Sequence, residues 1–290
     1  MSGQVANVSA SGRTREFNFT DEDFDQLRAI VKETTGINLA DSKRELVYGR
    51  VSRRLRALGM NSFRDYRRLL TTADGAHEMI EFSNAITTNL TAFYREPHHF
   101  EYLAKNFLEP LLNKPGASRR IRMWSAGCST GEETYSIAMT IHDTLQNLSG
   151  WDIRILATDL DSDVLNKGIN GVYTEDRLQK LSKSLVGKYF RERVEGTKRV
   201  YSISPDLKAM VTYKQLNLMH QLPMKGPLDV IFCRNTVIYF DKETQKTLFA
   251  RIARLQREGD LLFLGHSESL FKVSDAYDLI GKTIYRRNGR

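Results

Sequence analysis

The sequence predicts an α/β protein: a doubly wound sheet with a small all-helical N-terminal domain and a small antiparallel β insert. Apolar residues recur at helical spacing up to about residue 86, and strand and helix patterns alternate after it. The alternation breaks between about residues 171 and 210, where Lys198–Ile203 reads as a short alternating strand. The first pattern predicts the helical domain, the second the sheet and the third the insert.

The helical domain is expected over residues 16–86, after a flexible leader of residues 1–15. Thr20 precedes three acids and is a predicted N-cap, and the helix it begins should run to about Thr35 and end at Gly36. Two or three more short helices are expected, around residues 42–58, 62–71 and 77–86. A linker over residues 87–98 and an α/β domain over residues 99–290 complete the predicted organisation.

Composition agrees with a protein of two domains. A chain of 290 residues with 41% hydrophobic residues can bury a sizeable core. No signal peptide is visible and no run approaches the roughly 18 apolar residues of a membrane helix, so we expect a cytoplasmic protein without membrane insertion. Cys128 and Cys233 form no Cys-x-x-Cys pair and should be reduced. His98 and His99 are adjacent rather than helix-spaced, which favours no metal site.

The segment from Trp124 to Glu133 is the most informative, because it passes from an apolar strand through small residues into a helix. Small residues and free helical N–H groups suit a bound nucleotide cofactor. The turn lacks both the P-loop ending and the Gly-x-Gly-x-x-Gly pattern. Glu132 and Glu133 would repel a phosphate and attract a cation such as S-adenosylmethionine, whose amino group and sulfonium are positive. A tight turn with acids that satisfy the helix dipole is the alternative.

Two further strand ends carry polar residues. The strand over residues 153–159 ends in Asp159, an acid placed to accept hydrogen bonds from ribose hydroxyls. Its surroundings imitate a calcium loop, but Val164 stands where the turn needs Gly, and this disfavours calcium. A third strand, over residues 228–232, leads into the polar segment 233–240. In an open α/β sheet such ends face the ligand crevice.

The chain resembles the bacterial chemotaxis receptor methyltransferases (CheR) over nearly its whole length. The resemblance rests on five motifs in the family's order: residues 88–96, 124–138, 157–161, 233–240 and 265–268. Thr236 stands where the family usually has Val, a like-shaped change. The resemblance implies a Rossmann-like methyltransferase sheet, S-adenosylmethionine as cofactor with S-adenosylhomocysteine as product, and esterification of glutamates on chemoreceptors by a cytoplasmic enzyme recruited to receptor arrays. We expect a monomer.

The resemblance also implies the site residues. Positions that match the family's cofactor contacts are Asn89, Thr91, Arg95, Glu133, Asp159, Asn217, Leu218, Arg234 and Asn235. Glu132 is an alternative to Glu133 for the amino group, Asp159 would bind the ribose, and Asn217 and Leu218 would lie along the adenine. The catalytic positions are Arg95, which would orient the incoming carboxylate, and Tyr239, whose hydroxyl would point towards the methyl. The residues alone also allow Arg95 an interdomain ion pair and Tyr239 a place in the core.

The chain has a net charge of +8, and many of its basic residues lie in the helical domain, where arginines are concentrated on two predicted helices. Arg50, Arg53, Arg54 and Arg56 are the expected partner-binding residues. A solvated face and a nucleic-acid surface are the other interpretations. The resemblance favours an acidic receptor over nucleic acid, since a basic face would steer that encounter. A nucleic-acid methyltransferase and a non-catalytic receptor-binding scaffold are the alternative functions; the segment 235–239 lacks an Asn-Pro-Pro-Tyr motif.

The predicted insert departs from part of the family. Some members use it to hold a pentapeptide at the receptor C-terminus, through a loop with two glycines one residue apart. This chain has a charged loop over residues 191–199 with the single glycine Gly196. We therefore expect no binding of such a C-terminal pentapeptide tether.

Overall fold

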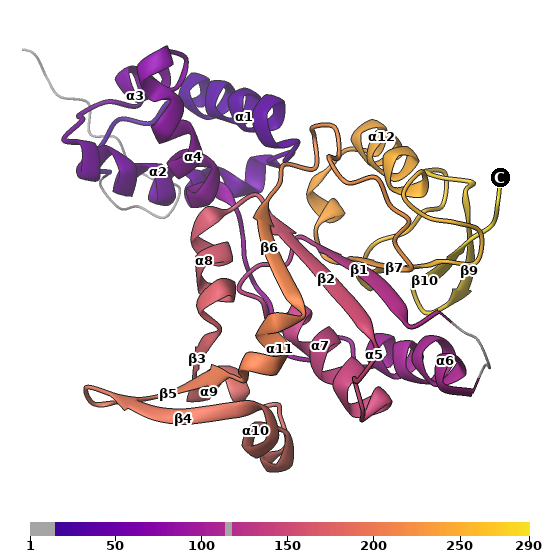
Figure 1. Ribbon diagram of the computed structural model, residues 1–290. Helices are drawn as coiled ribbons and strands as arrows, with labels where there is room; N and C mark the ends of the chain where they lie inside the picture. Colours follow the sequence, from indigo (N-terminus) through magenta and orange to yellow (C-terminus); the bar gives the residue numbers. More distant parts are fainter. Residues whose placement is uncertain (1–14, 114–117) are drawn as a thin grey trace, which may run out of the picture. The chain divides into compact units, whose positions relative to one another are not determined.

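The computed structural model describes residues 15–113 and 118–290 and divides into two compact units, Met1–Thr88 and Asn89–Arg290 (Figure 1). The predicted leader lies outside the described residues, except for Arg15. That residue pairs with Glu45 and packs its guanidinium 4.9 Å from the centre of the Tyr48 ring. No helix of the described part is both long and apolar enough to span a bilayer.

The first unit is helical, as predicted. Thr20 and Asp23 form a capping box: the Thr20 hydroxyl accepts from the Asp23 N–H at 3.1 Å, and the Asp23 carboxylate accepts from the Thr20 N–H at 2.9 Å. Gly36 closes the same helix in the left-handed conformation. The helices are α1 (Asp21–Thr35), α2 (Arg44–Leu58), α3 (Phe63–Leu70) and α4 (Ala76–Ile86), with 3₁₀ turns at Asp41–Lys43 and Ala73–Gly75.

A buried ion pair lies within the core of this unit. Glu78 is buried and its carboxylate accepts from Arg54 at 2.6 and 2.9 Å and from the Tyr66 hydroxyl at 2.6 Å. Tyr66 packs edge-on against Phe82. The pair therefore joins α2, α3 and α4 around a single carboxylate.

The second unit is built on a sheet with strand order β6-β2-β1-β7-β8-β10-β9 among the described residues. The first five strands run parallel, and β10 pairs antiparallel with both β8 and β9. The strands are β1 (Arg120–Ala126), β2 (Asp152–Asp159), β6 (Val211–Gln215), β7 (Val230–Cys233), β8 (Leu261–Leu264), β9 (Tyr277–Gly281) and β10 (Ile284–Arg287). The predicted doubly wound sheet is confirmed.

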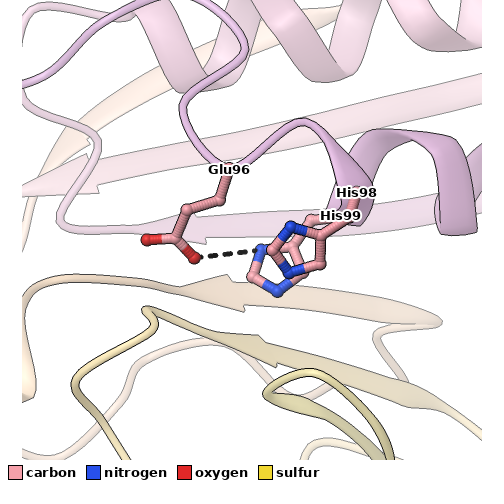
Figure 2. Close-up of side chains that lie close together, drawn as sticks. All are labelled: Glu96, His98 and His99. Carbon is pink, nitrogen blue, oxygen red and sulfur yellow. Dashed lines mark ion pairs between the residues drawn. The ribbon is translucent and has the colours of Figure 1, made fainter.

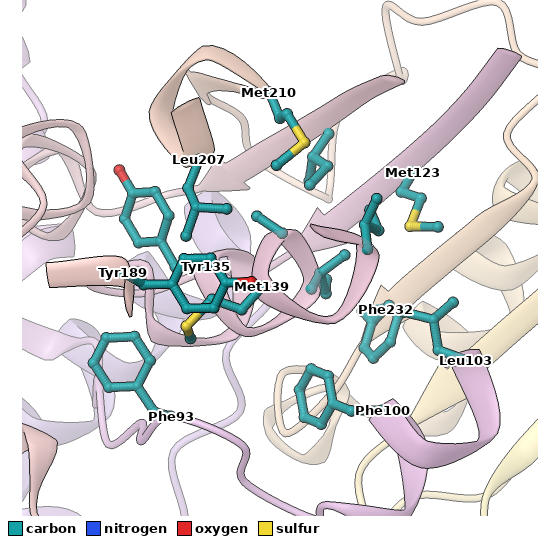
Figure 3. Close-up of a cluster of buried hydrophobic side chains, with 14 of the residues drawn as sticks. Phe93, Phe100, Leu103, Met123, Tyr135, Met139, Tyr189, Leu207, Met210 and Phe232 are labelled. Carbon is teal, nitrogen blue, oxygen red and sulfur yellow. The ribbon is translucent and has the colours of Figure 1, made fainter. Parts of the chain in front are cut away.

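Both faces of the sheet are covered by apolar contacts. Along β1, Ile121 and Met123 belong to one buried cluster and Trp124 and Ala126 to another, as the alternation of a strand requires. Figure 3 shows the first cluster, where α7 packs beneath the strands. The helices of this unit are α5 (His98–Tyr102), α6 (Glu109–Asn113), α7 (Glu132–Leu145), α8 (Ser162–Asn170), α11 (Pro205–Ala209) and α12 (Lys242–Ala253), with a π-helical turn at Leu103–Leu108 and a 3₁₀ turn at Val237–Tyr239.

The predicted insert is a separate three-stranded antiparallel sheet of order β3-β5-β4. Its hairpin projects from the rest of the unit (Figure 1). Strand β4 forms one edge and is exposed along all but its first residue. The elements are β3 (Val172–Thr174), α9 (Glu175–Leu178), α10 (Lys183–Tyr189), β4 (Phe190–Glu195) and β5 (Lys198–Ile203).

Replacing Glu78 by Ala should lower the free energy of unfolding of the helical unit by about 1.5–3 kcal/mol, because it removes the hydrogen bonds that Arg54 and the Tyr66 hydroxyl donate to a buried carboxylate. Glu81→Ala is the matched control. It removes the second carboxylate near Arg54, at 3.0 Å and 30% exposed, and should cost less than about 1 kcal/mol. Denaturant unfolding followed by circular dichroism compares the two variants. Equal losses would contradict a dominant role for the buried pair.

Candidate functional site

Three neighbouring strands bring their carboxyl ends together. Strand β1 lies between β2 and β7 in a parallel arrangement, so the segments after these strands meet at one edge of the sheet (Figure 1). They are the glycine loop after Ala126, Asp159 at the end of β2, and Arg234 after β7. Ligands of open α/β sheets bind at such an edge.

The glycine loop approaches its neighbours closely. A Cβ on Gly127, whose φ is +80°, would lie 2.2 Å from the Thr236 hydroxyl oxygen. A Cβ on Gly131, whose φ is +93°, would lie 2.6 Å from the Tyr213 hydroxyl. The N–H groups of Gly127 and Cys128 both donate to the Thr158 carbonyl, at 2.8 and 2.9 Å. Glycine is therefore required at both positions, and the loop is fastened to the end of β2.

Asp159 is held by the same loop. One carboxylate oxygen accepts from the Ser129 N–H at 2.8 Å and the other from the Asp161 N–H at 3.0 Å. Burial raises the pKa of the Asp159 carboxyl, and these two donors oppose that shift. The acid is thus fixed in orientation, and each oxygen keeps a lone pair for a ligand.

The structure distinguishes Glu132 from Glu133. Glu132 is buried, and its carboxylate accepts from Arg177 on α9 at 2.9 Å and from the Thr130 hydroxyl at 2.6 Å. Glu133 faces the strand ends instead, where it accepts from the Ser125 hydroxyl at 2.7 Å and from Arg234 at 3.2 Å. Glu133 thus faces the strand ends, whereas Glu132 faces Arg177 of the insert.

Arg234 lies at the centre of the charged groups. Its side chain is 1% exposed, and its guanidinium lies 3.2 Å from Glu133 and 3.5 Å from Glu96. It also donates to the backbone carbonyl of Arg95. Burial favours the protonated form of Glu96, but Arg234 and a hydrogen bond from His266 outweigh this and lower the pKa of Glu96 to about 2. The strand ends thus contain a fixed alternation of negative and positive groups.

The segment after Thr88 lies against this edge within the second unit. The Asn89 side-chain amide donates to Asp161 at 2.7 Å, and the Asn89 backbone carbonyl accepts from the Ser129 hydroxyl at 3.3 Å. The Thr91 carbonyl accepts from Arg177 at 3.2 Å. Arg95 donates to the Leu90 carbonyl at 2.8 Å. The three predicted residues Asn89, Thr91 and Arg95 are therefore next to the glycine loop and Arg234.

The remaining predicted residues lie on the segments after β6 and β7. The Leu216 N–H donates to the Asp159 carbonyl at 2.9 Å, which brings Asn217 close to the end of β2. Leu218 is 8% exposed and packs in the second buried cluster, so most of its surface contacts protein. Asn235 and Tyr239 belong to the segment that follows β7, and Tyr239 ends its 3₁₀ turn, half-buried.

Sequence reasoning did not single out four residues that organise this edge: Ser125, Glu96, Arg177 and Glu268. Glu96 and Glu268 lie in motifs that carry the family resemblance, so a signal was present for them. Ser125 also lies in such a motif, residues 124–138, whereas for Arg177 the signal is absent, because its partner Glu132 comes from a distant segment.

Glu96, His98 and His99 form a compact cluster (Figure 2). One ligand atom of each lies within 4.8 Å of the others, although the sequence favoured no metal site here. His99 Nδ1 lies 3.6 Å from Glu96, and its Nε2 lies 3.0 Å from the Lys282 carbonyl. Burial and the nearby Arg234 lower the pKa of His99 to about 4. The Arg234 guanidinium, 3.5 Å from Glu96, balances the negative charge of this cluster.

Three of the four predicted partner-binding arginines have partners within the helical unit. Arg50 donates to the carbonyls of Ala85 and Ile86 at the end of α4, at 3.0 and 2.7 Å. Arg54 pairs with Glu78, and Arg56 with Glu16 at 2.7 Å. Arg53 is exposed and forms no ion pair with any residue that the structure describes.

An open α/β sheet with a glycine loop and acids at adjacent strand ends defines a nucleotide-cofactor domain. The chain belongs to the CheR methyltransferase family. The protein family described as "CheR methyltransferase, SAM binding domain" matches residues 89–286, and the family "CheR methyltransferase, all-alpha domain" matches residues 22–87. The family resemblance found in the sequence is confirmed, and with it a methyltransferase with a domain that binds S-adenosylmethionine (SAM).

Similar proteins cover almost the whole chain. A probable chemotaxis protein methyltransferase of Rhizobium etli is 41% identical over 89% of this chain and 96% of its own length. Chemotaxis protein methyltransferase 2 of Pseudomonas aeruginosa is 41% identical over 93% of this chain and 95% of its own length. The chemotaxis protein methyltransferase of Escherichia coli is 39% identical, over 94% and 93%.

Proposed function

We propose that this protein transfers the methyl group of S-adenosylmethionine to glutamate side-chain carboxylates of membrane chemoreceptors. The products are glutamate methyl esters and S-adenosylhomocysteine, and the enzyme acts in the cytoplasm as a monomer without a metal ion. The names of the relatives support a role in chemotaxis. The observation that carries the proposal is the placement of Glu133 and Asp159 at adjacent strand ends beside a glycine loop.

These residues fit a cationic nucleoside better than a phosphate ligand. The Glu133 carboxylate would bind the amino group, and Asp159 would accept from the ribose hydroxyls. The loop has no P-loop lysine, and its carboxylates would repel a pyrophosphate. Asn89, Thr91, Arg234 and Asn235 would surround the methionine end, and Asn217 with the exposed edge of Leu218 would lie along the adenine.

The reaction needs little acid or base from the protein. Bound S-adenosylmethionine supplies a methyl group on a sulfonium, which departs as a neutral thioether. A glutamate carboxylate is already ionised near neutral pH and can act as the nucleophile directly. Arg95 would orient this carboxylate, and the Tyr239 hydroxyl would face the reacting methyl. Such placement can remove roughly 7–11 kcal/mol from a barrier.

Calorimetry in the presence of a chelator should detect binding of S-adenosylmethionine by the purified protein. Asp159→Ala should weaken this binding by about 1.5–3 kcal/mol, the range for hydrogen bonds to a charged group. Asp163→Ala is the matched control, since Asp163 is an exposed acid of the same segment and should change binding by less than about 0.5 kcal/mol. No binding heat for the parent protein, or unchanged binding by Asp159→Ala, would refute the assignment.

Arg53→Ala should slow methylation of receptor-bearing membranes at low salt and matter less at high salt, because screened charges no longer steer the encounter. Arg53 is chosen because Arg50, Arg54 and Arg56 have partners within the unit. Lys246→Ala on α12 removes the same charge elsewhere and is the control. Transfer of labelled methyl measures the rate. Labelling of RNA or DNA instead, with binding lost in Arg53→Ala, would favour a nucleic-acid methyltransferase. If no methyl group is transferred to any of these substrates, the result would favour a non-catalytic receptor-binding scaffold.

The insert should not bind an aromatic-rich receptor tail peptide. An incoming strand would need the edge of β4, and its exposed residues include Arg191, Glu192, Arg193 and Glu195. Long charged side chains protect an edge against strand addition. Titration of the isolated pentapeptide should therefore match that of a scrambled peptide. A micromolar dissociation constant, which corresponds to a binding free energy of about −8 kcal/mol, would show that a loop with the single glycine Gly196 suffices to bind the peptide.

A further inference from the structure

One buried carboxylate holds the segment that follows β7. Glu268 is 5% exposed, and its two oxygens accept from four backbone N–H groups. One oxygen accepts from Gly265 at 2.7 Å and from Asn235 at 2.8 Å. The other accepts from Val237 at 2.9 Å and from Ile238 at 3.2 Å. A single side chain thus joins the ends of β7 and β8.

The other hydrogen bonds from neighbouring elements to this segment use its carbonyls or the Thr236 side chain, not the N–H groups that donate to Glu268. In the 3₁₀ turn over Val237–Tyr239, the Val237 carbonyl accepts from the side-chain amide of Gln245 on α12 at 2.9 Å. Gly265 permits the close approach, because a Cβ there would lie 2.3 Å from the Asn235 side-chain nitrogen. Without Glu268, the N–H groups that donate to it would be left without acceptors, and a buried donor without an acceptor raises the free energy of the folded state.

We infer that Glu268 is a positioning residue that fixes Asn235 and Tyr239 for methyl transfer. It acts through backbone hydrogen bonds and makes no contact with substrate. The inference rests on the proposed function, in which Asn235 borders the cofactor and Tyr239 faces the methyl. Arg234 is held separately by Glu133 and Glu96, so loss of Glu268 should displace the segment after Arg234 more than Arg234 itself.

The first test is amide hydrogen exchange on the full chain, which does not depend on methyltransferase activity. Glu268→Gln keeps the side-chain shape but replaces one acceptor oxygen with a donor. The amides of Asn235, Val237 and Ile238 should exchange about tenfold faster or more, the change expected for a lost hydrogen bond to a charged group. Unchanged exchange in the folded variant would overturn the inference.

The second test is kinetic. In Glu268→Gln, kcat should fall about 10- to 100-fold, since a displacement of about 1 Å can cost about 100-fold in rate. The dissociation constant for S-adenosylmethionine should rise by a smaller factor than kcat falls, because Glu133 and Asp159 are untouched and Asn235 is the cofactor contact that moves. A parent protein that shows slow exchange but no cofactor binding would refute the proposed function and leave the role of Glu268 in place. Unchanged kcat would overturn the inference alone.

Asp229→Asn is the matched control, because Asp229 is a buried carboxylate just before the opposite end of β7 and accepts from the Arg122 N–H at 2.7 Å. It should lower stability without faster exchange at residues 235–238 and without the loss of kcat. The same changes in both variants would indicate general loosening and overturn the inference. If Glu268→Gln fails to fold, Gly265→Ala should displace Asn235 and give the same kinetic pattern; normal kcat there would also overturn it.

Discussion

The site depends on a buried positive charge at the carboxyl end of β7. The Arg234 side chain is almost wholly removed from solvent, and a buried guanidinium is stable only among carboxylates and carbonyls. Glu133 comes to it from α7, and Glu96 from the segment that precedes α5. The same charge therefore draws together three parts of the chain that are distant in sequence. The start of α7, the end of β7 and the segment before α5 are thus held together by one pairing requirement.

Features set by neighbours in sequence could be predicted, and those set by tertiary approach could not. The N-cap at Thr20 and the acid that ends β2 follow from local pattern. Nothing local separates Glu132 from Glu133, because adjacent side chains on a helix point about 100° apart and the packing of α7 decides which one faces the strand ends. Arg50 likewise has the helical spacing of a basic surface, yet it donates to carbonyls of α4, and the tertiary packing of the two helices determines this contact.

The insert is hydrogen-bonded to the glycine loop. The Tyr173 hydroxyl on β3 donates to the Thr130 carbonyl at 2.9 Å, and Arg177 on α9 reaches both Glu132 and the Thr91 carbonyl. Each of these bonds joins an element of the insert to backbone or side chain beside the strand ends. The insert is therefore part of the framework that shapes this edge, whatever its exposed hairpin contacts.

The contact between Gly127 and Thr236 makes two positions interdependent. The Thr236 hydroxyl occupies the place that a Cβ of residue 127 would take, and it lies 3.2 Å from the carbonyls of Ala126 and Arg234. A larger residue at 127 would need a smaller one at 236, and the left-handed backbone at 127 would still restrict the choice. Among descendants of this sequence a residue larger than glycine at position 127 should therefore occur only with a smaller residue at position 236, although over one hundred residues of chain separate them.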